Sequence, residues 1–237
     1  MRPDGRPTLS RAEARAVYDR FAEKGHIGGK DASSGYGGPA VRALLTFAAF
    51  SDAKTVLDYG CGQGKLAEVV LASHSELHWR GVDQSPKMVE RARERLQPFG
   101  DRAKVELLES GLPEDVDVPP GSVDRFVSTY VLDLLSERDM FAVLDQAKQS
   151  LHPQRGVLLL AGITWGYWDS FRTFFMTVVW NLLYRITRKT VGGCRPQNIE
   201  PYLKANGWTI VRSARTLPQG FPWMVSEVIC ARPPTWR

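Results

Sequence analysis

The fold of this chain is decided by the stretch Thr55-Val56-Leu57-Asp58-Tyr59-Gly60-Cys61-Gly62-Gln63-Gly64. A short apolar run ends in a carboxylate, and three glycines follow at alternate positions before a helix-like run begins at Lys65. Nineteen residues after the last glycine, a second apolar run ends in Asp83. A strand, a glycine turn, a helix and a second strand ending in a carboxylate are typical of a nucleoside-binding βαβ unit. Glycines let the backbone pass under a ligand, and the carboxylate can accept hydrogen bonds from ribose hydroxyls.

The glycine spacing separates two kinds of nucleoside cofactor. A dinucleotide fingerprint reads G-x-G-x-x-G and places a pyrophosphate at the helix N-terminus. Here the glycines stand at positions 60, 62 and 64, and Asp58 precedes them. A carboxylate at the mouth of the turn would repel a pyrophosphate and favour an amino group or a sulfonium. The alternative is a tight turn that binds nothing, but the two carboxylates that flank the glycines favour cofactor binding.

This run resembles the signature of class I S-adenosylmethionine-dependent methyltransferases, and further motifs follow in the family's order. They lie at residues 85–88, 107–113, 121–132 and 151–156. Together they make residues 15–164 similar to small-molecule methyltransferases of type 11, a broad group that includes the quinone-biosynthesis C-methyltransferases. The resemblance implies S-adenosyl-L-methionine as the cofactor.

Alternating strand-like and helix-like segments predict an α/β fold with a doubly wound, Rossmann-like sheet. The resemblance implies seven strands, mostly parallel with an antiparallel C-terminal strand, and helices on both faces. The chain is expected to form a single domain. Its parts would be N-terminal helices covering the site (1–50), a cofactor-binding core (51–164), a substrate lid (165–193), and a C-terminal helix with a β-hairpin (194–237).

The resemblance assigns cofactor contacts to particular positions. They are Asp58, Gly60, Cys61, Gly62, Gly64, Asp83, Gln84, Met88, Ser110, Gly111, Leu112, Tyr130, Val131 and Tyr36. Asp83 is expected to accept both ribose hydroxyls, and Met88 to pack on the adenine. Glu109-Ser110 stands where the family usually has a Gly-Asp pair facing the adenine amino group.

Catalytic residues are harder to derive, because methyl transfer needs alignment and exclusion of water and only sometimes a base. In the family's layout the expected methyl position is flanked by Tyr18, His26, Tyr36, Tyr130, Asp133 and Tyr167. Tyr130, His26 and Tyr18 are the catalytic candidates, with packing or gating as the alternative role for each. No metal is expected, since the three cysteines have no metal-ligand spacing.

The net charge of +5 is unevenly distributed. Residues 171–237 hold ten Lys or Arg against two Glu, whereas residues 1–170 are mildly acidic. This asymmetry indicates an anionic partner or a solvated basic face.

The segment 165–189 is too long for a simple connection. As a helix it places on one broad face Phe171, Phe174, Phe175, Val178, Leu182 and Arg185. This face is expected either to pack on the core or to cover a lipophilic or aromatic substrate. Arg185, Arg188 and Lys189 would suit an anionic substrate group or peripheral contact with a phospholipid surface.

Several substrate classes stay open at this point. A nucleic acid would fit the basic C-terminal third. However, residues 128–131 lack the Asn/Asp-Pro-Pro-Tyr run of enzymes that methylate exocyclic base amines, and residues 1–237 are not expected to include an RNA-binding module. A protein substrate and a catalytically silent assembly factor are further alternatives, although the chain keeps both the glycines and the ribose carboxylate.

The sequence therefore predicts a methyltransferase that acts on a small, lipophilic or aromatic metabolite and releases S-adenosylhomocysteine. Residues 1–237 contain no run of 18 apolar residues, residues 1–7 are not expected to be part of a secretory signal, and the few cysteines fit a reducing compartment. A cytoplasmic location is expected.

Overall fold

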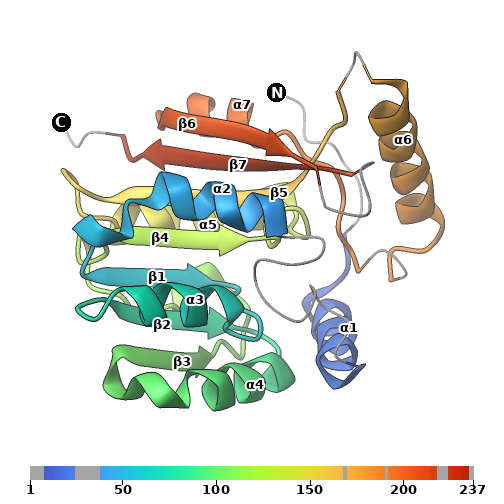
Figure 1. The fold of residues 1–237 in the computed structure, drawn as a ribbon. Helices are drawn as coiled ribbons and strands as arrows, with labels where there is room; N and C mark the ends of the chain where they lie inside the picture. Colours follow the sequence, from blue (N-terminus) through green and yellow to red (C-terminus); the bar gives the residue numbers. More distant parts are fainter. Residues whose placement is uncertain (1–7, 25–37, 168–169, 190–191, 218–223, 235–237) are drawn as a thin grey trace.

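A seven-stranded sheet forms the centre of the molecule (Figure 1). Its strands are β1 (Thr55–Tyr59), β2 (His78–Asp83), β3 (Ala103–Leu107), β4 (Arg125–Thr129), β5 (Val157–Thr164), β6 (Thr209–Thr216) and β7 (Val225–Arg232). The strand order is β3-β2-β1-β4-β5-β7-β6, and β7 runs antiparallel to both of its neighbours. The predicted mostly parallel, doubly wound sheet is confirmed. This computed structural model describes residues 8–24, 38–167, 170–189, 192–217 and 224–234.

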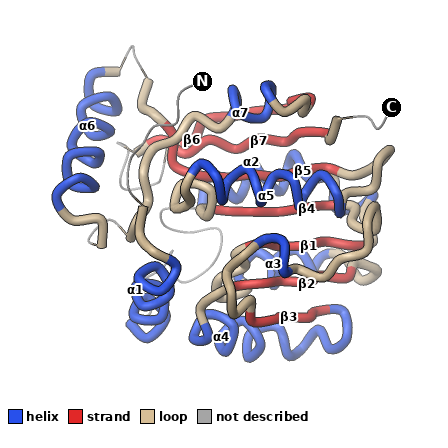
Figure 2. The backbone as a smooth tube through the Cα atoms, turned by 180° about the vertical axis from the view of Figure 1, so that it is seen from behind, coloured by secondary structure: helices blue, strands red, loops and turns tan. Residues whose placement is uncertain are grey.

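Helices cover both faces of the sheet (Figures 1 and 2). One face packs on α2 (Gly38–Ala48), α3 (Lys65–Ser73) and α4 (Pro86–Leu96), and the other on α5 (Glu137–Ser150) and α7 (Glu200–Ala205). Short 3₁₀ turns occur at Phe50–Asp52, Gln97–Arg102 and Pro113–Asp115. Neighbouring strand residues point to opposite faces, so that Val56 joins the first core and Leu57 the second.

Local capping signals fix two of the helices that the site depends on. Helix α1 (Arg11–Lys24) begins with a reciprocal capping box, in which the backbone N–H of Glu13 donates to Ser10 Oγ (3.2 Å) and that of Ser10 donates to Glu13 Oε2 (3.0 Å). Ser85 caps α4 by accepting a hydrogen bond from the backbone N–H of Met88 (3.2 Å), with Pro86 in the first turn. The pairs Ser10–Glu13 and Ser85-Pro86 are local sequence signals for a helix start, and both helices begin at them.

Two helices lie outside the layers, beside the carboxyl ends of the parallel strands: α1 and α6 (Phe171–Ile186) (Figure 1). The predicted helix within 165–189 is therefore present. The alternative in which its apolar face packs on the core is wrong, because Phe171, Phe175, Val178 and Leu182 are exposed to solvent. The alternative in which this segment covers a substrate stays a prediction. In the described part of the chain, no helix has the length and apolarity that crossing a bilayer requires.

Candidate functional site

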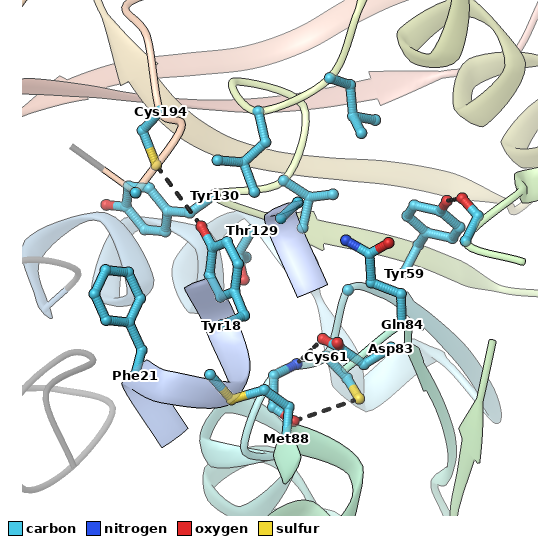
Figure 3. Close-up of a pocket in the computed structure, with 18 of the residues that line it drawn as sticks. Tyr18, Phe21, Tyr59, Cys61, Asp83, Gln84, Met88, Thr129, Tyr130 and Cys194 are labelled. Carbon is cyan, nitrogen blue, oxygen red and sulfur yellow. Dashed lines mark hydrogen bonds between the residues drawn. The ribbon is translucent and has the colours of Figure 1, made fainter. Parts of the chain in front are cut away.

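A cavity of about 520 Å³ lies at the carboxyl ends of β1 and β4. The strand order reverses between these two strands, and such switch points are where open α/β sheets bind ligands. The volume is within the range of small-ligand sites. Figure 3 shows side chains from α1, the glycine turn, the end of β2 and the end of β4 around this cavity.

The glycine turn forms one wall of the cavity. The backbone N–H groups of Gly60 and Cys61 donate to the carbonyl oxygen of Val82 (2.8 and 3.1 Å), which ties the turn to β2. Gly62 has a φ of 54°, and a Cβ added there would meet no protein atom within 4 Å. Because Gly62 also lines the cavity, a Cβ would occupy space that is open to a ligand.

The other two glycines serve different purposes. A Cβ on Gly60 would lie 2.3 Å from Cγ2 of Val131, so this glycine makes room for a protein side chain. A Cβ on Gly64 would press against Ala92 and Leu96 of α4, and Gly64 does not line the cavity. Of the three glycines, Gly62 is therefore the one whose missing side chain leaves room for a ligand.

Asp83, at the end of β2, presents a carboxylate to the cavity. Its Oδ2 accepts from the backbone N–H of Gly62 (2.9 Å), and its Oδ1 accepts from that of Ser85 (2.8 Å). Burial raises the pKa of Asp83, and these backbone donors oppose the rise. A carboxylate has about four acceptor positions, so capacity remains for two further donors such as vicinal hydroxyls.

Asp58 lies beneath the cavity rather than on its wall. The side chain is buried, and its Oδ1 has no hydrogen-bond partner among the residues that the structure describes. Burial raises the pKa of Asp58 to about 8, with a further contribution from the charge of Asp83. A buried carboxyl group beside a cavity would be stabilised in its ionised form by a cationic ligand.

The raised pKa of Asp58 has a consequence for stability. The folded chain favours the neutral carboxyl, because the pKa is about 8 against an ordinary value of 3.8. The stability that the neutral carboxyl contributes is complete below the ordinary pKa of 3.8 and is lost as the pH rises through the folded pKa of about 8. The free energy of unfolding of the cofactor-free protein should therefore fall between pH 5 and 8, by up to about 1.4 kcal/mol per pH unit for this group.

Urea unfolding at several pH values checks this expectation. Asp58→Asn should show a shallower fall than the wild type, although a residual slope remains because the pKa values of Asp83 and Asp133 are raised as well. The exposed Asp145→Asn is the control and should keep the wild-type slope. Equal slopes in the wild type and Asp58→Asn would show that Asp58 does not titrate in this range.

Tyr130 forms the wall at the end of β4. It adopts a φ of 57°, which is uncommon for a residue with a side chain, and its N–H donates to the carbonyl oxygen of Ala161 (2.6 Å). Its hydroxyl shares a hydrogen bond of 2.9 Å with Ser226 Oγ. Burial raises the pKa of Tyr130, so the phenol stays neutral.

An aromatic chamber lies at the α6 end of the cavity. In Figure 3, Tyr18 and Phe21 of α1 lie on the same side as Tyr130 and Cys194. The Tyr18 hydroxyl lies 3.8 Å from Cys194 Sγ, and burial raises the pKa of both groups. Trp180 of α6 also lines the cavity, and its Nε1 donates to the carbonyl oxygen of Cys194 (2.9 Å). Apolar and neutral aromatic groups thus dominate this end.

Side-chain contacts hold α1 over the cavity. Asp19 accepts hydrogen bonds from Ser85 Oγ and from the backbone N–H of Lys87 at the start of α4. Arg15 donates to the carbonyl oxygen of Glu109, and Arg11 forms an ion pair of 2.8 Å with Asp139. Since the anchors lie at the start of α4, on the loop after β3 and on α5, α1 is held across the cavity.

Most of the sequence-predicted positions meet at this cavity. Those that line it are Tyr18, Gly60, Cys61, Gly62, Asp83, Gln84, Met88, Gly111, Tyr130 and Val131. Those away from its wall are Asp58, Gly64, Ser110, Leu112, Asp133 and Tyr167. Ser110 accepts a hydrogen bond from the N–H of Leu112 (3.0 Å), so its hydroxyl stabilises a turn. His26 and Tyr36 lie outside the described residues.

Asp133 and Tyr167 do not line the cavity, and each has its own hydrogen-bond partner. Asp133 is fully buried, accepts a hydrogen bond from the N–H of Ile163 (3.2 Å), and has a pKa that burial raises to about 7. The Tyr167 hydroxyl donates to the carbonyl oxygen of Arg215 (3.4 Å).

Sequence reasoning missed several lining residues: Arg11, Phe21, Tyr59, Leu134, Trp180 and Cys194. Tyr59 carried a usable signal, because it stands within the glycine motif itself. Its hydroxyl donates to the carbonyl oxygen of Gly111 (3.2 Å), and its ring stacks on Phe126. The others come from segments whose proximity the local sequence does not specify.

Comparison with known proteins agrees with this geometry. Residues 56–154, which include the glycine turn and Asp83, match the family model of a methyltransferase domain. No curated protein is similar enough in sequence to count as a match.

Solved structures share the fold at low sequence identity. The [4+2]-cyclase SpnF is 15% identical with a TM-score of 0.70, over 98% of this chain and 100% of that chain. An O-methyltransferase family protein from Burkholderia thailandensis is 18% identical with a TM-score of 0.62, over 94% and 60%. Geranyl diphosphate C-methyltransferase from Streptomyces coelicolor A3(2), solved with Mg²⁺, geranyl diphosphate and S-adenosyl-L-homocysteine, is 13% identical with a TM-score of 0.60, over 81% and 76%.

Proposed function

Since the chain is a class I S-adenosylmethionine-dependent methyltransferase, we propose that it methylates a small, lipophilic or aromatic metabolite. The observation that carries this proposal is the aromatic chamber beside the cofactor wall. Tyr18, Phe21 and Trp180 enter it from two helices outside the sheet layers. Such a chamber favours an acceptor that buries apolar surface and exposes its reactive atom toward Tyr130.

The cavity wall fits the cofactor. Gly62 leaves space for the backbone to approach it, Asp83 has acceptor capacity for its ribose hydroxyls, and Met88 offers an apolar surface to its base. When bound, S-adenosylmethionine supplies an electrophilic methyl group on a sulfonium. The carboxyl group of Asp58 beneath the turn would stabilise nearby positive charge once it is ionised.

The chain's own contribution to the chemistry is alignment and exclusion of water. Among the described cavity-lining residues the carboxylates are Asp83 and Asp139, and Asp139 is paired with Arg11. Burial keeps the phenols of Tyr18 and Tyr130 neutral, which suits both side chains to a role as walls and hydrogen-bonding groups. This arrangement suits an acceptor atom that is nucleophilic without strong base assistance.

The lining also favours a small molecule over a macromolecule. Among the described residues, the basic side chains on the cavity wall are Arg11 and Lys65, and the guanidinium of Arg11 is bound to Asp139. An RNA substrate would require a cationic approach to the reacting centre.

We further propose a division of the single domain into parts. Residues 1–50 and 165–193 cover a cofactor-binding core at 51–164, and residues 194–237 form the C-terminal helix and hairpin. The side chains of α1 and α6 in the cavity support it.

Transfer of a tritiated methyl group from labelled cofactor tests the proposal. The acceptors are a panel of lipophilic phenols, quinols and isoprenoids, with total RNA and denatured protein in parallel. We expect label in the organic extract. Label that precipitates with RNA or protein would contradict a small-molecule acceptor, and tight cofactor binding without any transfer would indicate a silent assembly factor.

Trp180→Ala tests whether the aromatic chamber binds the acceptor and not the cofactor. Loss of this aromatic wall should raise KM for the acceptor about tenfold or more, while the Kd for S-adenosylmethionine changes less than about twofold. Val211→Ala, an exposed substitution on β6, is the matched control and should change neither value. A Trp180→Ala variant with unaltered KM would remove the aromatic chamber as the acceptor site.

A further inference from the structure

Helix α6 has its apolar side turned to solvent. Thr173, Thr177 and Tyr184 are buried on its inner side. The outer side carries Phe171, Phe175, Val178, Leu182 and Ile186, whose exposed fractions lie between 46% and 79%. We call these five residues the outer face. An amphipathic helix of a globular protein normally buries its apolar side, so this reversed arrangement indicates a surface that something else covers.

Hydrogen bonds fix the rotation of α6 about its own axis. The N–H of Gly166 donates to Thr177 Oγ1 (3.0 Å), and that of Tyr167 donates to Thr173 Oγ1 (3.0 Å). The Trp180 indole is held by the carbonyl oxygen of Cys194. Rolling the outer face inward would break all three contacts and bury polar groups without partners. These contacts therefore fix the outer face in its solvent-exposed orientation.

The charges around the outer face are basic. Arg172 and Arg185 are exposed on α6, and Arg188 follows its C-terminus. Lys189 forms an ion pair of 3.3 Å with Glu13 of α1. No Asp or Glu occurs in the sequence from Ser170 to Ile199. An apolar face bordered by arginines, without acidic residues in the same segment, matches the chemistry of an anionic lipid surface.

We propose that the outer face docks on the anionic headgroup region of a phospholipid membrane. The apolar side chains would enter the boundary between headgroups and acyl chains, and Arg172 and Arg185 would contact phosphates. Figure 1 shows α6 at the margin of the molecule, apart from the sheet, where a flat surface can reach it. Trp180 on the opposite side of α6 lines the cavity, so docking would hold the acceptor chamber close to the membrane.

A second copy of this chain fits the outer face less well. A two-fold pairing of α6 with itself would bring the arginines of both copies to one interface. The segment 170–199 offers no carboxylate to neutralise them. Like charges at a desolvated interface oppose association, whereas lipid phosphates would attract the same residues.

Co-sedimentation of the full chain with vesicles tests the proposal. Vesicles containing phosphatidylglycerol should bind the protein, vesicles of phosphatidylcholine alone should bind it weakly, and added salt should reduce the binding. Phe175→Ser with Leu182→Ser should weaken binding at least about tenfold. Arg172→Gln and Arg185→Gln should each weaken it about fivefold. Val211→Ser, equally exposed but on β6, should bind as the wild type does.

Three outcomes would overturn the proposal. The first is that the protein does not bind anionic vesicles, and the second is that the outer-face variants bind them as the wild type does. The third is that the protein does not bind vesicles but forms a dimer in sedimentation velocity, and that Phe175→Ser with Leu182→Ser dissociates this dimer. The outer-face variants should keep the wild-type Kd for S-adenosylmethionine, which shows that they are folded. Methyl transfer to a soluble acceptor does not require the membrane contact, so failure of one proposal is distinguishable from failure of the other.

Discussion

Gly62→Ala should weaken S-adenosylmethionine binding about ten- to a hundredfold in a chain that still folds. The added methyl group meets no protein atom within 4 Å and enters the cavity, so it collides with the ligand rather than with the fold. Forcing one extra methyl group into a filled site costs about 1–3 kcal/mol, which corresponds to this loss of affinity. Isothermal titration calorimetry measures the effect directly.

The positive φ of Gly62 requires a matched control, because alanine is strained there whatever the space. Gly121 has a φ of 68°, its Cβ would make ordinary contact with Pro153 at 3.6 Å, and it does not line the cavity. Gly121→Ala should lower the free energy of unfolding by about 1–2 kcal/mol, as Gly62→Ala does, but should leave cofactor affinity unchanged. An equal loss of affinity in both variants would attribute the effect to backbone strain and remove Gly62 as the cofactor wall.

The sequence predicted the core of the fold because its signals there are local. The glycine run, the capping box at Ser10 and the Ser85-Pro86 helix start each depend on neighbouring residues, and all of them appear in the structure. The individual purposes of the glycines could not be predicted. Gly60 is required by Val131, which comes from a loop some seventy residues later in the chain and reaches the turn only through the pairing of β1 with β4.

The residues of the aromatic chamber could be predicted only in part. Tyr18 and Tyr130 were expected at the site, but Trp180 and Cys194 were not. Their position depends on how the connection after β5 returns across the cavity, and no local pattern specifies this path. Long-range packing therefore contributed the residues that shape the acceptor chamber.

The orientation of α6 shows a second limit of sequence patterns. Periodicity correctly predicted that Phe171, Phe175, Val178 and Leu182 share one helix face, but it does not state which way that face points. Thr173 and Thr177 decide the orientation by accepting backbone hydrogen bonds from the connection that follows β5. These contacts form only in the folded chain.

Asp83→Ala should weaken cofactor binding at least about tenfold and also destabilise the chain. The variant removes two acceptors for ribose hydroxyls, and hydrogen bonds to a charged group contribute about 1.5–3 kcal/mol each. It also leaves the backbone N–H groups of Gly62 and Ser85 without their acceptors. Leaving these two donors unpaired should lower the free energy of unfolding by about 2 kcal/mol, which would lower the melting temperature by about 4–8 °C.

Asp19→Asn distinguishes the loss of the ribose contact from the loss of negative charge near Asp83. Asp19 contributes a negative charge close to Asp83 and accepts hydrogen bonds from Ser85 and Lys87, but it does not line the cavity. The amide oxygen of asparagine can still accept from Ser85, so α1 should stay anchored while the charge is lost. Asp19→Asn should therefore keep cofactor affinity within about threefold of the wild type, since the charge that it removes lies outside the cavity. Equal losses of affinity in both variants would show that the negative charge near Asp83, and not its two oxygens, holds the cofactor. A loss in Asp83→Ala alone would assign the affinity to the direct contact, because each variant removes one of two neighbouring negative charges.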